Sequence, residues 1–360
     1  MTFIIKNKQF FTVQLLMWND KFNRRAMPWK GEKDPYKIWL SEIILQQTRV
    51  DQGLEYYNRF IKTFPTVEKL AVAPETKVFK LWEGLGYYTR CKNLIATAKF
   101  IAKELNGKFP DKYEDILSLK GIGPYTAAAI ASFAFNLPYA VVDGNVFRVL
   151  SRYFNIDTAI DSTEGKKQFT LLAEELLDKE KPGLYNQALM DFGATVCKPQ
   201  SPNCSDCPLN KTCLAFSKGW VDKLPVKEKS ITKKTRWLYY LVIKHNDLVY
   251  VQKRGGNDIW ENLYEFFPIE MKEELTMKGI KVLDIFKEES FSGARIKYIS
   301  DEYKQLLTHQ IIKGRFIQID MPKPFSAKGF KAITIKEMSK LPFPKFITLF
   351  LEDKNVSLNS

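Results

Sequence analysis

The sequence predicts two domains, an all-α domain over residues 8–217 and a mixed α/β domain over residues 232–355, joined by a basic linker over 218–231. Three observations support this division. Apolar residues recur at three- and four-residue spacing through the first region, β-rich runs replace that period after residue 217, and four cysteines crowd together near the end of the first region. With 360 residues and 45% hydrophobic content, the chain can bury two or three ordinary cores.

The helical period begins near residue 8 and recurs through the first domain. Its clearest example is the spacing of Ile38, Trp39, Ile43, Leu45 and Val50. Further helices are expected at 53–63, 78–82, 92–105, 116–119, 125–135, 146–154, 163–177 and 183–196. The separators contain Pro or Gly, as in FPTVEKLAVAPE, and are expected to be loops.

A change of composition marks the second domain. The stretch from Lys218 to Arg236 carries seven Lys or Arg residues against two acids, as expected for a basic linker. WLYYLVIKHNDLVYVQKR then gives two β-rich runs around His245, which predicts a hairpin. GRFIQIDM (314–321) predicts a further strand, and helices are expected at 336–340 and 345–352.

The chain is strongly basic, with a net charge of +14 and a pI near 9.3. This balance favours a polyanionic partner, either nucleic acid or an acidic membrane surface. No stretch predicts a membrane span, because the longest apolar run is short and is broken by Asn136 and Pro138. No secretory signal is recognisable, so we expect a cytoplasmic protein, in which cysteines bind metals more often than they form disulfides.

Four of the five cysteines fall in one short loop with the spacing C-x6-C-x2-C-x5-C: Cys197, Cys204, Cys207 and Cys213. Four thiolates this close together can hold one soft metal centre. A structural zinc site more often uses two separated C-x2-C pairs, but the spacing alone leaves both zinc and an iron–sulfur cluster open. Cys91 stands apart and is expected to be a packing residue.

The stretch LSLKGIGPYTAAAI (117–130) places Gly121 and Gly123 before a predicted helix. No G-K-[ST] follows, which excludes a nucleotide P-loop, and no strand precedes it, which excludes a Rossmann fingerprint. The pattern predicts a helix-hairpin-helix with Pro124 in the first helical turn. Its glycines would let the backbone approach a nucleic-acid phosphate. An ordinary corner between two helices is the alternative.

Two carboxylates stand out in a chain that has only two histidines. Glu42 lies inside the apolar helix WLSEIILQQTRV, where desolvation should raise its pKa and suit it to general acid catalysis, unless it pairs with an arginine. Asp143 begins the helix in VVDGNVFRVLSR, as a helix cap or as an anion that supports a sugar cation. An acid for the leaving base and an anion for an oxocarbenium-like transition state are what N-glycosidic cleavage needs.

On these motifs, residues 10–217 resemble the helix-hairpin-helix DNA glycosylase superfamily of endonuclease III, and SEIILQQT resembles its adenine-excising MutY branch. The resemblance implies one 4Fe-4S cluster on the four cysteines. It also implies a monomeric enzyme that acts on double-stranded DNA with adenine opposite 8-oxoguanine or guanine. Glu42 would then protonate N7 of the flipped-out adenine and activate water. Asp143 would stabilise the C1′ cation electrostatically or by a transient covalent bond, and Asn145 would support it.

The resemblance also assigns residues around these carboxylates. Bifunctional members carry a lysine two positions after the second hairpin glycine, but this chain has Tyr125, which implies a glycosylase without lyase activity. Gln47 and Tyr87 match positions that wedge into DNA beside the lesion pair, and Thr48 is expected to contact DNA next to Gln47. Four residues align with the adenine pocket, although many relatives have Arg where this chain has Lys30: Arg25, Trp29, Lys30 and Leu45.

The second domain resembles the terminal domain of MutY, which is related to the MutT (NUDIX) fold, through QKRGGNDIWENLYEFF. The segment 268–285 offers only MKEEL in place of an R-E-x-x-E-E core, so the domain is expected to recognise DNA rather than hydrolyse nucleotides. Relatives sense 8-oxoguanine with a Phe-Ser-His loop. The nearest match here is Leu307-Thr308-His309, in which Thr308 keeps the hydroxyl; a simple strand boundary is the alternative.

Two other functions stay open at this point. One is a pyrimidine-lesion glycosylase/lyase like endonuclease III, which Tyr125 and the second domain disfavour. The other is a non-enzymatic iron–sulfur protein that binds DNA or senses redox state. The presence of both Glu42 and Asp143 disfavours it, because DNA binding alone needs neither.

Overall fold

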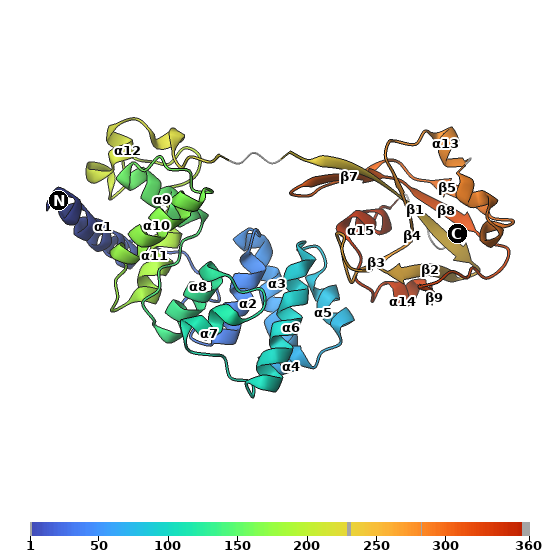
Figure 1. Cartoon of the computed structure of the whole chain (residues 1–360), viewed down its shortest axis with the longest axis horizontal. Coiled ribbons are helices and arrows are strands. Elements are labelled where there is room, and N and C mark those ends of the chain that lie inside the picture. The colour runs from blue at the N-terminus through green and yellow to red at the C-terminus, as the bar shows by residue number, and fades with distance from the viewer. Residues whose placement is uncertain (1, 229–231, 282, 355–360) are drawn as a thin grey trace. The chain divides into compact units, whose positions relative to one another are not determined.

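The computed structural model describes residues 2–228, 232–281 and 283–354, and its contacts divide the chain into two compact units. The helical unit comprises Met1–Ala71 and Ala96–Ser230, and the sheet unit comprises Val72–Ile95 and Ile231–Ser360. Figure 1 traces the order of the elements. Among the described residues, no helix combines the length and the apolarity needed to cross a membrane.

Helices make up the ordered elements of the helical unit, as the apolar period predicts. They are α1 (Thr2–Lys21), α2 (Pro35–Leu45), α3 (Val50–Thr63), α4 (Val67–Ala71), α7 (Tyr113–Ser118), α8 (Pro124–Phe135), α9 (Gly144–Phe154), α10 (Thr163–Leu176), α11 (Pro182–Thr195) and α12 (Leu214–Ser217), with short 3₁₀ turns at Asn210–Thr212 and Val221–Lys223. Helix α6 (Tyr88–Glu104) begins in the sheet unit and ends in the helical unit. The expected boundaries hold to within a few residues.

Two local predictions in this unit are wrong. The separator FPTVEKLAVAPE contains helix α4, which forms because Val67 and Leu70 are buried. The period from Ile38 to Val50 is interrupted, since α2 ends at Leu45 and α3 begins at Val50. Gln47 lies in this interruption with a φ of 57°, a left-handed conformation that no helical period can anticipate.

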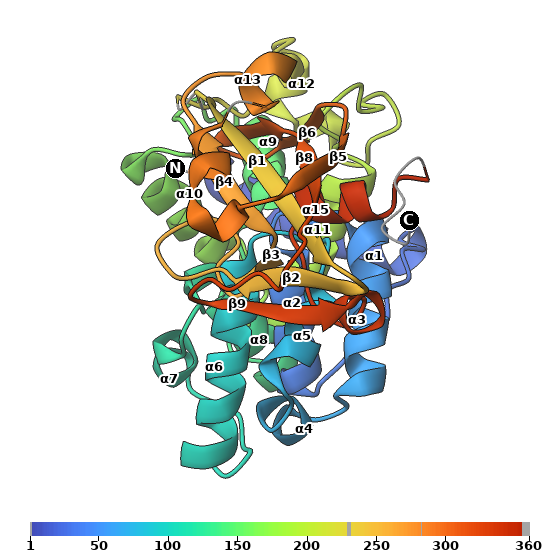
Figure 2. The ribbon, with the colours of Figure 1, turned by 90° about the vertical axis from the view of Figure 1, so that its right-hand side faces the viewer.

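The core around α9 and α11 positions much of the site described below. The two helices are in direct contact. Figure 1 draws them next to each other, and Figure 2 shows the same ribbon turned by 90°. Val149 and Leu150 of α9 and Leu189 of α11 are buried against Phe11 of α1. Each such side chain contributes about 1.5–3 kcal/mol of burial free energy, which fixes the start of α9 and the side of α11 next to it.

The sheet unit is built around one long strand, β1 (Lys234–His245). Strands β2 (Leu248–Lys253) and β4 (Phe267–Met271) pair with it antiparallel, and β7 (Gln310–Gly314) and β8 (Phe316–Asp320) pair with it parallel. The other elements are β3 (Tyr264–Glu265), β5 (Arg295–Ile299), β6 (Tyr303–Leu306), β9 (Phe330–Thr334), α5 (Glu75–Trp82), α13 (Met277–Lys281), α14 (Ile335–Met338), α15 (Lys345–Leu351) and 3₁₀ turns at Asp284–Lys287 and Glu289–Phe291. The mixed α/β prediction and the hairpin after His245 are confirmed.

Candidate active site

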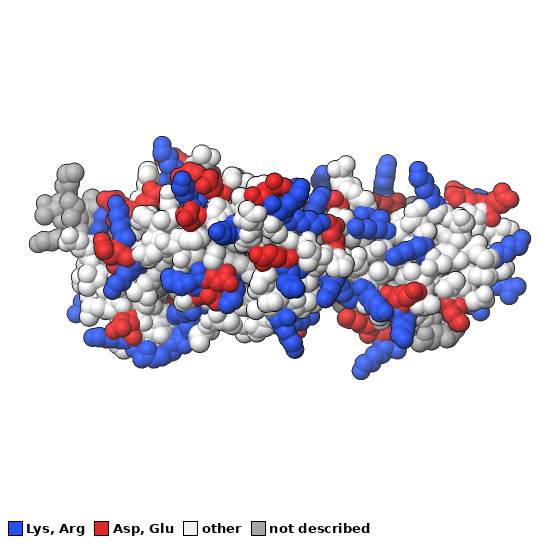
Figure 3. Space-filling view, turned by 90° about the horizontal axis from the view of Figure 1, so that it is seen from below, with Lys and Arg blue, Asp and Glu red and all other residues white. Residues whose placement is uncertain are grey.

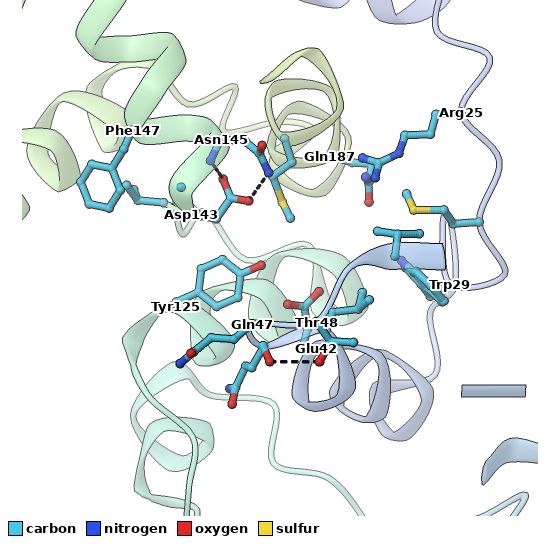
Figure 4. Close-up of a pocket in the computed structure, with 17 residues that line it drawn as sticks. Arg25, Trp29, Glu42, Gln47, Thr48, Tyr125, Asp143, Asn145, Phe147 and Gln187 are labelled. Atoms are coloured by element: carbon cyan, nitrogen blue, oxygen red, sulfur yellow. Dashed lines mark hydrogen bonds between the residues drawn. The ribbon is translucent and has the colours of Figure 1, made fainter. Parts of the chain in front are cut away.

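A cavity of about 500 Å³ lies in the helical unit between α2, α8, α9 and α11 (Figure 4). It brings together nine of the residues that the sequence predicts for the site: Arg25, Trp29, Glu42, Leu45, Gln47, Thr48, Tyr125, Asp143 and Asn145. These residues come from positions more than one hundred apart in the chain, so the fold assembles the site.

Glu42 is a buried carboxyl group on α2, 5% exposed. Asp34 caps and stabilises the N-terminus of α2: its side chain accepts a hydrogen bond from the backbone N–H of Tyr36 at 2.9 Å. Burial and the nearby charge of Asp143 raise the pKa of Glu42 to about 7. The predicted shift therefore has the expected direction and cause, and its hydrogen-bond partner is Tyr125 rather than an arginine.

Tyr125 projects from the first turn of α8 into the cavity, between Asp143 and Glu42 in Figure 4. Its hydroxyl donates a hydrogen bond to the Glu42 carboxyl group. This bond partly offsets the burial of Glu42 and lowers its pKa. Burial and both carboxylates raise the pKa of Tyr125 itself well above the usual range, so the phenol stays a proton donor.

Asp143 both caps α9 and lines the cavity, so the two interpretations of this residue are compatible. Its Oδ1 accepts the backbone N–H groups of Asn145 and Val146, each at 2.8 Å, and its Oδ2 accepts Asn145 Nδ2 at 2.6 Å. A helix N-terminus alone would lower the pKa of Asp143. Burial outweighs it and the three hydrogen bonds, so the pKa is raised, contrary to the expected direction.

A buried aspartate anchors one wall of the cavity. Asp191 of α11, whose side chain is fully buried, accepts hydrogen bonds from Arg25 Nη1 at 2.9 Å and Lys30 Nζ at 3.0 Å. It also accepts Gln187 Nε2 at 3.1 Å. Arg25 and Gln187 line the cavity, whereas Lys30 supports the wall through Asp191. Trp29 packs edge-on against Tyr57, with ring centroids 5.1 Å apart.

Sequence reasoning missed part of this wall. The cavity is also lined by Met27, Gln46, Val50, Val142, Gly144, Phe147, Gln187 and Met190. The segment NQALMDFG carries a local signal for it, because Asp191 lies inside an apolar helix, as Glu42 does. The i, i+4 spacing of Gln187 and Asp191 also places the two on one face of that helix.

The glycine hairpin has the predicted geometry. Helices α7 and α8 flank it, Gly121 has a φ of 79°, and Pro124 occupies the first turn of α8. No atom lies within 4 Å of a Cβ placed on Gly123, so the backbone there is open to a partner. On the face drawn in Figure 3, Lys and Arg side chains are spread among acidic ones. The hairpin is therefore the more specific indication of DNA binding.

The four cysteines of the loop line one cavity together with Arg152. Arg152 Nη1 approaches Cys197 Sγ at 3.5 Å. Burial raises the pKa of Cys207 to about 12, so this thiol needs a cationic centre to ionise near neutral pH. As placed in the described part of the chain, no three His, Cys, Asp or Glu side chains form a group that could hold a metal ion. The donor set of four thiols nevertheless suits a soft centre.

Three predicted DNA contacts belong to the sheet unit. Tyr87 lies in the turn before α6, with a φ of 48° and an exposed fraction of 43%. Thr308 and His309 lie in the turn between β6 and β7. The structure joins two of the three, because the Tyr87 hydroxyl and Thr308 Oγ1 form a hydrogen bond.

Comparisons with known proteins agree with this geometry. Residues 40–177 match the HhH-GPD superfamily of base excision DNA repair proteins. The chain is similar to a solved thermostable thymine-DNA glycosylase, with 30% identity, a TM-score of 0.56, and 60% of this chain and 99% of that chain covered. It also resembles endonuclease III in a trapped covalent complex with DNA, with 21% identity, a TM-score of 0.51, and 59% and 98% covered, which shows the fold alone.

Two curated relatives are similar to this chain in sequence, and one of them covers most of it. The chain is 42% identical over 214 residues to the human adenine DNA glycosylase, which covers 57% of this chain and 39% of that protein. It is 37% identical over 303 residues to the adenine DNA glycosylase of Buchnera aphidicola subsp. Baizongia pistaciae, with 83% of each chain covered. A similarity of that extent shows that this chain belongs to the adenine DNA glycosylase family.

Proposed function

We propose that this protein hydrolyses the N-glycosidic bond of adenine mispaired with 8-oxoguanine or guanine in double-stranded DNA, as a monomer in base excision repair. The observation that carries the proposal is the cavity in which Glu42 and Asp143 meet. Family membership supports adenine as the base removed. Tyr125 supports hydrolysis without strand cleavage, since a phenol cannot form a Schiff base with the sugar.

We assign the acid–base chemistry to Glu42. A pKa of about 7 leaves much of this group protonated at neutral pH, which is the state a general acid needs. Its proton passes to N7 of the adenine, the C1′–N9 bond breaks, and the adenine leaves with the bonding electron pair. The resulting carboxylate then takes a proton from the water that attacks C1′.

We assign Asp143 to the stabilisation of the sugar cation. Its carboxylate lines the same cavity and is held in place by Asn145. A fixed anion there favours positive charge on C1′ more than it favours the neutral substrate, and this difference is what accelerates the reaction. Asn145 is then a positioning residue, and the Tyr125 hydroxyl keeps the Glu42 carboxyl group oriented.

The flipped-out adenine would lie against the wall of the cavity formed by Arg25, Trp29 and Leu45. Lys30 would support this wall through its ion pair with Asp191. Flipping a base out of the duplex costs a few kcal/mol, and we propose that Gln47 fills the gap left in the helix, with Thr48 beside it. Gln47 has a left-handed backbone, is exposed and lines the cavity, which supports this role.

We propose that Cys197, Cys204, Cys207 and Cys213 hold one 4Fe-4S cluster. The cluster would supply no reaction step; bound to the four thiolates, it would fix the fold of the loop. The Gly121–Gly123 hairpin would bind a DNA phosphate.

For the sheet unit we propose a NUDIX-like domain that recognises the base opposite the adenine. Tyr87 and Thr308 would contact that base, with His309 beside them. The domain division that we propose is 8–217, a linker over 218–231, and 232–355. Residues 229–231 and 355 lie outside the described residues.

The test is to incubate the purified protein with duplexes carrying adenine opposite 8-oxoguanine, guanine or thymine, and with a thymine glycol duplex, and then to treat with alkali. We expect alkali-dependent cleavage at adenine opposite 8-oxoguanine and guanine. Glu42→Gln should abolish cleavage and retain binding, whereas the exposed Glu55→Gln should behave as wild type. Strand scission without alkali would favour a lyase, and tight binding without base release would favour a binding protein.

A further inference from the structure

The turn that carries Tyr87 is tightly built although it is exposed. It has left-handed backbone at Gly84, Gly86 and Tyr87. The Gly86 carbonyl accepts the Trp82 indole N–H at 3.0 Å, which closes the turn onto the end of α5. The turn is therefore attached to the end of α5, so a change in the position of that helix end would also move Tyr87.

The end of α5 is tied to the segment 341–343 of the same unit. Glu83 Oε1 accepts the backbone N–H of Phe343 at 2.7 Å, and its Oε2 accepts Lys80 Nζ at 2.6 Å. Lys80 Nζ also donates to the Leu341 carbonyl at 3.0 Å. We call this arrangement the 80–83 clamp. The Glu83 side chain is 19% exposed and the Lys80 side chain 34%, so the clamp is partly shielded from water and should be stronger than a fully exposed ion pair.

The segment 341–343 is connected to the turn that carries Thr308 through helix α15 and strand β6. Phe343 is buried and stacks on Phe266, and α15 starts two residues later. Helix α15 packs on β6, where Tyr303 donates to Asp353 at 2.6 Å. Strand β6 ends at Leu306, directly before the turn that carries Thr308.

The clamp and the Tyr87–Thr308 hydrogen bond thus join the same two pieces, which Lys92 and Glu261 also link by an ion pair at 2.6 Å. A hydrogen bond between two exposed hydroxyls competes with water and contributes little alone. Holding the pieces together beforehand removes much of the entropic cost of aligning the two groups.

We propose that Glu83, supported by Lys80, is a specificity-determining positioning residue: the 80–83 clamp holds Tyr87 and Thr308 as one preformed reader of the base opposite the adenine. The inference rests on the proposed function, because it takes that base to be what Tyr87 and Thr308 contact. Glu83 itself contacts no DNA and acts only through Tyr87 and Thr308.

The test compares full-length Glu83→Ala and Glu83→Gln with Glu104→Ala, which removes an exposed acid on α6. The measured quantity is the single-turnover rate of adenine release opposite 8-oxoguanine divided by the rate opposite guanine. Glu83→Ala should lower this ratio about tenfold, because the charge-assisted hydrogen bond that holds Phe343 N–H is lost together with the contact to Lys80. Glu83→Gln should keep this ratio close to that of the wild type, since the amide oxygen still accepts the Phe343 N–H.

Two further measurements separate positioning from a general loss of structure. In a Thr308→Ala background, Glu83→Ala should lower the ratio no further, because the reader is already lost. In DNA-free protein, amide hydrogen exchange should rise at both 84–88 and 306–310 in Glu83→Ala, and at neither in Glu104→Ala.

An unchanged ratio in Glu83→Ala, or additive losses with Thr308→Ala, would overturn the inference. If wild-type protein releases no adenine, or releases it equally opposite both bases, the proposed function fails in whole or in part. Hydrogen exchange in Glu83→Ala then still tests whether the clamp couples residues 84–88 to residues 306–310. Faster exchange confined to 84–88 would show that the clamp does not hold the Thr308 turn.

Discussion

Arg148 Nη2 donates a hydrogen bond to Asn145 Oδ1 at 2.9 Å, one turn along α9. The same guanidinium donates to the Gly193 carbonyl at 2.7 Å and, through Nε, to the Cys197 carbonyl at 2.8 Å. Asn145 in turn donates to Asp143. A single buried side chain therefore connects the cysteine loop to the carboxylate that we assign to the sugar cation.

Replacing Arg148 by Met should slow adenine release at least about tenfold, because Asn145 loses the donor that orients it. Asn145→Ala should produce a similar decrease, and the double variant should be no slower than the slower single variant. Single-turnover rates at saturating enzyme measure this, with circular dichroism melting as the check on folding. Fully additive losses would show that Arg148 does not act through Asn145.

The pH dependence of adenine release tests the Glu42 assignment. Since Glu42 must carry a proton, the rate should fall as pH rises through about 7. The hydrogen bond from Tyr125 lowers the pKa of Glu42, so Tyr125→Phe should move this decline to higher pH. Rates from about pH 5 to 9 in both proteins decide it. A decline that moves to lower pH in Tyr125→Phe would contradict the assigned contact.

The buried Glu42 should also reduce stability in a pH-dependent way. Below pH 4.5 both the folded and the unfolded chain carry the proton; between 4.5 and about 7 the unfolded chain loses it first, so the folded state is progressively destabilised. Glu42→Gln removes this effect and should be more stable than wild type above pH 7, by about 3 kcal/mol. Urea unfolding at pH 4.5 and 8 gives the difference, which should vanish at the lower pH.

The fold class followed from the sequence because local periodicity encodes it. The helices of the first region and the hairpin at His245 come from period and turn residues alone. The break at Gln47 could not be predicted in this way, since α2 stops where tertiary packing, not propensity, requires a turn. The short strands β3 and β6 and the inclusion of Val72–Ile95 in the sheet unit depend equally on contacts distant in sequence.

The candidate site likewise contains residues that the local sequence predicts and residues that it does not. Glu42 and Asp143 were found because a carboxylate in an apolar helix or at a helix start is unusual in itself. Arg148 carries no such local mark, because its role arises from partners in other parts of the fold. The raised pKa of Asp143 reflects burial by several elements at once, which one helix N-terminus cannot reveal.

The identity of the metal centre can be tested by removing one ligand. Cys204→Ser should yield protein with less iron and sulfide and with weaker brown colour, since three thiolates hold a 4Fe-4S cluster poorly. DNA binding should weaken more than the rate of base release from bound DNA, because the proposed cluster would shape the loop and take no part in the reaction. Metal analysis that finds zinc and no iron in wild-type protein would replace the cluster by a zinc site.

Asp191→Asn should weaken both the fold and the adenine pocket. The change leaves Arg25 and Lys30 without their buried counter-charge. Loss of a fully buried pair costs about 3–5 kcal/mol, and because both cations are partly exposed we expect roughly 2–3 kcal/mol. Urea unfolding measures this loss, with the exposed Asp111→Asn expected to stay within about 0.5 kcal/mol of wild type.

With Arg25 no longer held in Asp191→Asn, the DNA concentration needed for half-maximal adenine release should rise about tenfold. Normal stability together with normal release would show that Asp191 anchors neither cation.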